Sequence, residues 1–118
     1  IPTQLVDVEI DLGEISWELV EGIEQCKPYG MGNPSPIFCS SNVRVIGINT
    51  VGDGKHLRLT IQSSSGKIQK MIGFKFGTWI DQLHFGDVID VLYEVSVNEW
   101  NGNRELQGRI VDIRRQQI

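Results

Sequence analysis

The residue types that hold metals or act as nucleophiles are few and scattered in this sequence. Hydrolysis of a phosphodiester by two metal ions needs clustered aspartates and histidines, such as Asp-His-His runs, and the chain contains no such run. His56 and His84 have no carboxylate or cysteine at ligand spacing. Cys26 and Cys39 also lack such spacing; they could form one disulfide, but we favour buried free thiols in a reducing cytoplasm. The sequence therefore predicts no metal, no other cofactor and no catalytic residue in this chain on its own.

Basic side chains offer a different chemistry, the binding of a polyanion. The chain has 118 residues and a net charge of −4, which by itself disfavours nucleic acid, but the charge is unevenly distributed. Residues 1–36 contain one base and seven acids, a balance of −6, whereas residues 37–118 contain ten bases and eight acids, a balance of +2. Residues 44–75 alone contain six bases and one acid, a balance of +5. Any site for a polyanion should therefore lie in that segment.

One part of this basic segment alternates like a strand. Residues 55–62 place Leu57, Leu59 and Ile61 on one face and polar side chains on the other. Basic residues of the neighbouring predicted strands would extend this polar face, although a merely solvated face is the alternative. A tryptophan in the loop after the fourth predicted strand either stacks on bases or folds back to cap the barrel end. The residues that we expect to bind nucleic acid are Arg44, Lys55, His56, Arg58, Lys70 and Trp100.

The elements that must position these side chains are all β after residue 36. Alternation and turn residues predict strands over 43–48, 55–62, 67–76, 87–98 and 104–113, and a short helix over 78–83. On the third strand we expect Ile68, Ile72, Phe74 and Phe76 to face inward, and Trp17 and Trp79 to lie in the core. Asn101-Gly102 is a strong hairpin signal, and a shift in the last strand at Val111 indicates a bulge.

This order of elements predicts an all-β protein with a five-stranded OB-fold, a Greek-key barrel with one helix between strands three and four. An SH3-like barrel is the alternative, but it would not use that helix. OB-folds bind single strands of nucleic acid on the wall that carries the basic residues here, and the loops after strands one and four close over the ligand. The predicted fold and the predicted site therefore agree.

The first 36 residues have a different pattern. Residues 4–10 alternate as a short strand, and Ser16 is a candidate N-cap of a helix whose apolar face is Leu19, Ile23 and Cys26. Pro28 ends this helix. We expect residues 1–36 to be a connector from a preceding domain that packs beside the barrel without entering it, and residues 37–118 to form the OB-fold domain.

Two motifs resemble those of the RecJ family, bacterial exonucleases specific for single-stranded DNA. The segment 28–38 reads PYGMGNPSPIF and matches the family signature P-[FY]-G-x-G-N-P-x-P-x-F, and 53–58 matches D-G-x-H-L-[KR]. Weaker similarity continues to residue 113, so the resemblance covers nearly the whole chain. The residues that carry the first motif, which we expect to be structural, are Pro28, Tyr29, Gly30, Gly32, Asn33 and Pro34.

The resemblance implies a parent enzyme that degrades single-stranded DNA from 5′ to 3′ with Mn²⁺ or Mg²⁺ in recombination and repair. In that family the OB-fold follows the DHH and DHHA1 catalytic domains, whose motifs are absent here. The implied partners are single-stranded DNA and those missing domains, and the implied role is to guide the strand to their metal site. The alternative is a structural or protein-interaction domain that docks on the catalytic core or on another partner. We expect a cytoplasmic location, because the sequence shows neither a membrane span nor a signal peptide.

Overall fold

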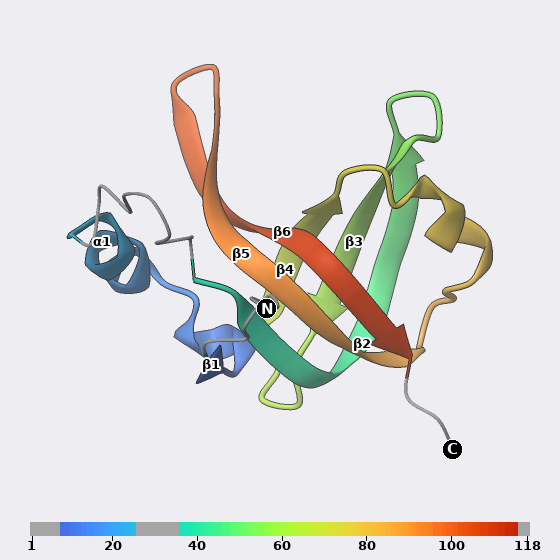
Figure 1. The fold of residues 1–118 in the computed structure, drawn as a ribbon, viewed down its shortest axis with the longest axis horizontal. Coiled ribbons are helices and arrows are strands. Elements are labelled where there is room, and N and C mark those ends of the chain that lie inside the picture. Colours follow the sequence, from blue (N-terminus) through green and yellow to red (C-terminus); the bar gives the residue numbers. More distant parts are fainter. Residues whose placement is uncertain (1–7, 26–35, 116–118) are drawn as a thin grey trace, which may run out of the picture.

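A closed five-stranded barrel forms the centre of the computed structural model, which describes residues 8–25 and 36–115 (Figure 1). Neighbouring strands follow the order β2-β3-β4-β6-β5, and β5 pairs back to β2 and closes the barrel. Only β4 and β6 are parallel within this ring. The predicted OB-fold is confirmed. Its strands are β2 (Phe38–Val51), β3 (His56–Gln62), β4 (Ile68–Gly73), β5 (Val88–Trp100) and β6 (Asn103–Arg115).

The inward-facing residues of β3 are the predicted ones, whereas those of β4 are not. Leu57, Leu59 and Ile61 are fully buried. On β4 the prediction was wrong, because Ile68 and Phe74 are about half exposed and Met71 points inward instead. Met71 lies directly opposite Leu59 across the antiparallel pair, and residues that oppose each other share a face of the sheet. The register with β3 therefore decides which face of β4 is inside, since both faces carry apolar residues.

The strand β2 begins earlier than predicted and pairs with two neighbouring strands of the barrel. Its first half pairs with β5, and its second half, from Arg44, pairs with β3. An irregularity between Ser40 and Val43 lies where the strand bends from one neighbour toward the other. The bulge predicted at Val111 is also confirmed, because Leu92 pairs with Asp112 while Tyr93 pairs with Ile110. The bends allow long strands to close the barrel.

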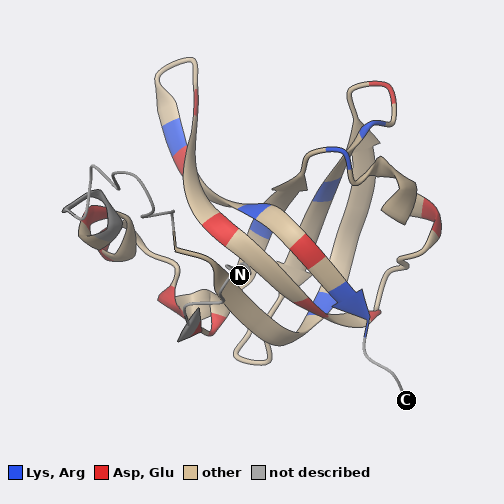
Figure 2. Ribbon diagram, in the orientation of Figure 1, with Lys and Arg blue, Asp and Glu red and all other residues tan. Residues whose placement is uncertain are grey.

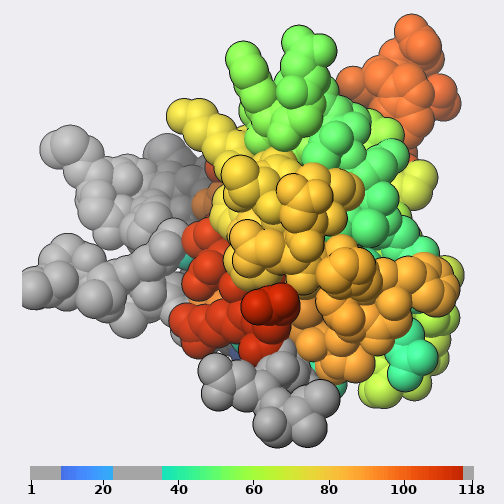
Figure 3. All heavy atoms as spheres, turned by 90° about the vertical axis from the view of Figure 1, so that its right-hand side faces the viewer, coloured from blue at the N-terminus to red at the C-terminus, as the bar shows by residue number. Residues whose placement is uncertain are grey.

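The predicted helix between strands three and four is the short 3₁₀ helix η2 (Gly77–Asp81). Its first residue touches the loop between β2 and β3, and the Gly77 amide donates to the Lys55 carbonyl oxygen at 3.0 Å. A Cβ at this position would collide with the Gly54 carbonyl oxygen, so glycine is required. Figure 3 shows the β2–β3 loop (green) against η2 (yellow). Trp79 packs against the core from this helix, as predicted.

The N-terminal segment enters the fold, contrary to the prediction that residues 1–36 stay outside the barrel. It forms β1 (Val8–Glu9), η1 (Leu12–Glu14) and α1 (Trp17–Gln25), and β1 pairs in parallel with the start of β2. Ile10, Leu12 and Ile15 belong to the buried core. The physical reason is that β3 covers only the second half of β2, so the first half leaves an edge that β1 fills. The role of residues 1–36 as a connector stays a prediction.

The predicted start of α1 is confirmed, whereas the predicted burial of Trp17 is wrong. The Ser16 side-chain oxygen accepts a hydrogen bond from the Leu19 amide at 3.2 Å, as an N-cap does. Trp17 is 43% exposed and lies under the Arg104 guanidinium of β6, 4.9 Å from the ring centroid. Cys26 and Pro28, predicted on and after the helix, lie outside the described residues. Among the helices described, none is long and apolar enough to cross a membrane.

A buried hydrogen-bond chain links the N-terminal segment to the barrel. The Ser40 hydroxyl donates to the Ile10 carbonyl oxygen at 2.7 Å, so its oxygen is left to accept from the Tyr93 hydroxyl 2.8 Å away. Burial raises the pKa of the Tyr93 hydroxyl to about 12, against an ordinary value of 10.0. The folded state therefore holds this proton more tightly than the unfolded state does.

This difference predicts a loss of stability at alkaline pH. Below pH 10 both states keep the proton, and above it the unfolded state ionises first, so the free energy of unfolding falls as the pH rises toward 12. We expect the loss to reach about 1 kcal/mol at pH 11. Urea unfolding at pH 8 to 11 checks this against Tyr93→Phe, which should lack that part of the decline. An equal decline in both proteins would contradict it.

Candidate functional site

The outer wall of β3 and β4 carries the predicted basic face. Arg58 opposes Ile72 and Thr60 opposes Lys70 across the antiparallel pair, so the four side chains share the outer face. Arg58 and Lys70 are exposed. Within the part of the chain that the structure describes, neither forms an ion pair. Two cations on this wall are therefore available to a bound anion.

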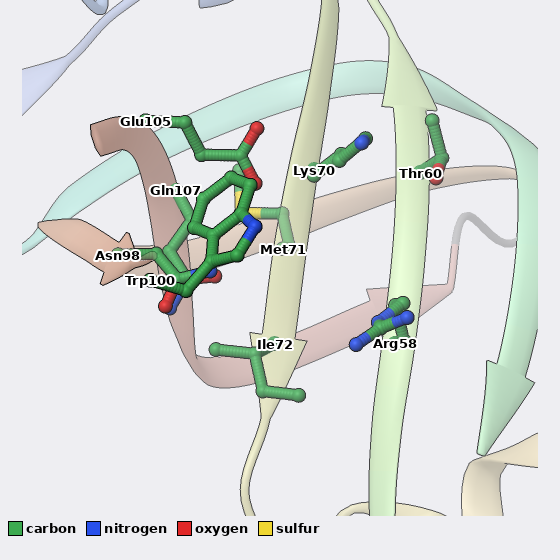
Figure 4. Close-up of a pocket in the computed structure, with 9 residues that line it drawn as sticks. All are labelled: Arg58, Thr60, Lys70, Met71, Ile72, Asn98, Trp100, Glu105 and Gln107. Atoms are coloured by element: carbon green, nitrogen blue, oxygen red, sulfur yellow. The ribbon is translucent and has the colours of Figure 1, made fainter. Parts of the chain in front are cut away.

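A groove of about 380 Å³ lies where this wall meets the far end of the β5–β6 hairpin (Figure 4). In Figure 4 the β3 side chains stand on one side, the hairpin side chains on the other, and β4 runs between them. A ligand in the groove can therefore contact the basic side chains of β3 and β4 and the mainly polar side chains of the hairpin. Its lining residues are Arg58, Thr60, Lys70, Met71, Ile72, Asn98, Trp100, Glu105 and Gln107.

The hairpin turn positions the aromatic residue of the groove. Asn101 and Gly102 both have positive φ, 48° and 79°, as a two-residue type I′ turn requires, which confirms the predicted hairpin. Trp100 is the last residue of β5, opposite Asn103, and is 44% exposed. Trp100 lines the groove, and its stacking on a base stays a prediction.

Contacts between β4 and β6 hold the β5–β6 hairpin beside β4. The sequence of either strand alone does not predict these contacts. Gln69 is buried on the inner face of β4 and donates to the Leu106 carbonyl oxygen of β6 at 3.0 Å. Met71 covers Gly108 so closely that a Cβ there would collide with its sulfur. These contacts bring the outer face of β6 next to the basic wall, and the groove follows from that.

Three of the six predicted binding residues line the groove and three do not. Arg44 is exposed at the other end of the wall, where it opposes Gln62, and Lys55 is exposed in the β2–β3 loop. His56 is partly buried: its Nδ1 accepts from the Lys75 amide at 3.0 Å, and its ring forms a T-shaped pair with the Phe74 ring, with centroids 5.3 Å apart. The groove therefore unites Arg58, Lys70 and Trp100. The predicted motif 28–34 lies outside the described residues.

Three polar side chains of the β5–β6 hairpin were not among the predicted site residues. Asn98, Glu105 and Gln107 line the groove. A signal was present, since each alternates with an inward apolar residue near Trp100. It could not be used, because alternation shows that a side chain points outward but not what it faces.

Charge elsewhere on the hairpin is largely neutralised by ion pairs. Arg109 pairs with Glu94 at 2.7 Å and Arg104 with Glu99 at 3.6 Å between nitrogen and oxygen. Figure 2 shows both signs of charge along β5 and β6. Divalent metal ions need several clustered ligands, and among the described residues no three histidine, cysteine or acidic side chains gather in that way. The described residues thus do not fit the Mn²⁺ or Mg²⁺ that the resemblance implies for the parent enzyme.

A family model described as the RecJ OB domain matches residues 6–112. The single-stranded-DNA-specific exonuclease RecJ of Bacillus subtilis is 30% identical over 113 residues, which are 95% of this chain and 14% of the relative. RecJ of Salmonella typhimurium is 28% identical over 110 residues, 91% of this chain and 18% of the relative. The chain thus spans less than a fifth of either relative.

Solved structures share the fold. RecJ from Thermus thermophilus, crystallised with Mg²⁺, superposes with a TM-score of 0.67 at 23% identity over 95% of this chain and 16% of that one. Rim1, a mitochondrial single-stranded DNA binding protein of Saccharomyces cerevisiae, gives a TM-score of 0.53 at 12% identity over 70% of this chain and 96% of that one. At these identities the likeness concerns the fold.

Proposed function

The chain belongs to the RecJ OB domain family, and from that premise we propose that its groove binds single-stranded DNA. The observation that carries the proposal is the groove itself. In it Arg58 and Lys70, which have no ion-pair partner among the described residues, lie across from the exposed indole of Trp100. The two cations can bind phosphates, and an unpaired base can stack on the indole ring. Both halves of a nucleotide thus find a matching surface.

The same geometry favours a single strand over a duplex. Stacking on a side chain needs a base face that is free, and in a duplex both faces are covered by neighbouring bases. The relatives agree with this choice, since RecJ is named for its specificity for single-stranded DNA and Rim1 is a single-stranded DNA binding protein. Neither name mentions a sequence preference.

The wider role follows from the parent that the family implies. We infer that this OB-fold is one module of a single-strand exonuclease and guides the strand toward a metal site on the DHH and DHHA1 domains. The chain itself would bind DNA and leave hydrolysis to those domains. This division of labour is supported by the coverage of the Bacillus subtilis relative, of which the matched segment is only 14%.

A second candidate function is docking on the catalytic core or on another protein. Phe85, between η2 and β5, is 75% exposed and does not line the groove. This exposed apolar ring is available to a protein partner. The two functions use different surfaces and can coexist.

Titration of labelled single-stranded and duplex oligonucleotides of equal length, at two salt concentrations, tests the proposal. The single strand should bind more tightly, and its affinity should fall with salt because bound phosphates release counterions. Equal affinity for both, or an affinity that salt does not change, would reject the groove as a single-strand site and favour the docking function.

A further inference from the structure

The polar side of the groove contains an acidic residue, Glu105, which would be unfavourable in a site that bound phosphates alone. Glu105 lies directly opposite Asn98 on the neighbouring strand, so the two side chains share a face, and Trp100 is on that face two residues further along β5. All three line the groove, and Figure 4 shows the Glu105 carboxylate and the Trp100 ring on the same side of it. A carboxylate therefore lies beside the expected stacking platform.

This acid differs from the other acids of the hairpin in its partners. Glu94 and Glu99 each pair with an arginine of β6. Within the described part of the chain Glu105 makes no ion pair, although its side chain is partly buried. Near a phosphate it would repel the ligand, whereas beside the indole it meets the edge of a stacked base. Its position thus points to a contact with bases.

The chemistry of a carboxylate selects among base edges. It accepts hydrogen bonds and donates none. Cytosine and adenine present an exocyclic amino donor, and guanine presents two adjacent donors on its Watson–Crick edge. Thymine presents a single N–H between two carbonyl acceptors, which repel a carboxylate. We propose, on the basis of the proposed function, that Glu105 makes this groove prefer bases with an exocyclic amino group, and cytosine over thymine in particular.

Homopolymers of cytosine and thymine give the sharpest test, because the two rings are of similar size and stack alike on Trp100. At neutral pH we expect oligo-dC to bind the 118-residue chain about fivefold more tightly than oligo-dT of equal length, at the low end of what one base-edge contact supplies. Glu105→Gln should bring the ratio close to one, because an amide can both donate and accept. It should also strengthen binding of oligo-dT, because a repelling charge is removed.

Glu99→Gln is the matched control, since it removes the same charge from the same hairpin outside the groove. It should leave the dC-to-dT ratio unchanged, and an equal shift in both variants would overturn the inference. A ligand-side control needs no mutation: oligo-dC with dimethylated N4 amines should bind no better than oligo-dT. Salt-dependent binding with a ratio of one in the unaltered chain would reject the base preference and leave the proposed function standing. Failure of every oligonucleotide to bind would reject both.

Discussion

Arg58→Ala combined with Lys70→Ala is expected to weaken single-stranded DNA binding by roughly tenfold to a hundredfold at low salt. Both cations line the groove and have no ion-pair partner among the described residues, so each is available to a phosphate. Each lost phosphate contact should also flatten the slope of log affinity against log salt by about 0.7, giving about 1.4 for the pair. Fluorescence titrations at several salt concentrations measure both quantities.

Arg44→Ala combined with Lys55→Ala is the matched control for this double variant. It also removes one arginine and one lysine from the exposed surface, but neither residue lines the groove. A local phosphate site predicts a much smaller loss in this control. If the control weakens binding as much, the DNA follows the wider basic surface that the sequence analysis predicted, and the groove is not the site.

The sequence predicts the barrel well where a strand has one apolar face and less well where it has two. On β3 the alternation has one solution, and Leu57 and Leu59 are buried as expected. On β4 both Ile72 and Met71 are apolar, and the pairing of Met71 with Leu59 determines that Met71 is the one that points into the barrel. Register is a property of two strands, so the alternation of one strand could not supply it.

The same limit applies to the candidate site. The outward direction of Arg58 depends on local parity and was predicted. Lys70 shares its face with Ile68 and Ile72, so its outward direction follows from the pairing of β4 with β3 and not from the alternation of β4 alone. The position of Glu105 depends on the parallel pairing of β4 with β6, which brings together segments distant in the chain. The burial of Leu12 likewise depends on an edge that the long β2 leaves open. Local patterns thus indicate what a side chain can do, and the non-local pairings determine which side chains act together.

Trp100→Ala is expected to weaken single-strand binding by about fivefold to a hundredfold, the equivalent of about 1–3 kcal/mol for one stacked base. The loss should leave the salt slope nearly unchanged, because stacking releases no counterion from a phosphate. Trp100→Phe should retain much of the affinity, since a smaller aromatic ring still offers a flat face. The combination of a large loss and an unchanged slope distinguishes this residue from Arg58 and Lys70.

Trp17→Ala provides the control for a general loss of exposed aromatic surface. Trp17 is 43% exposed and Trp100 is 44% exposed, but only Trp100 lines the groove. Trp17 also contacts Arg104, so thermal unfolding of both variants should be measured to verify that the hairpin stays folded. A folded Trp17→Ala that binds DNA like the unaltered chain, beside a folded Trp100→Ala that binds weakly, would assign the stacking contact to the groove. If the folded Trp100→Ala binds as tightly as the folded Trp17→Ala, Trp100 is not part of the DNA site, and docking through the exposed Phe85 becomes the stronger candidate function.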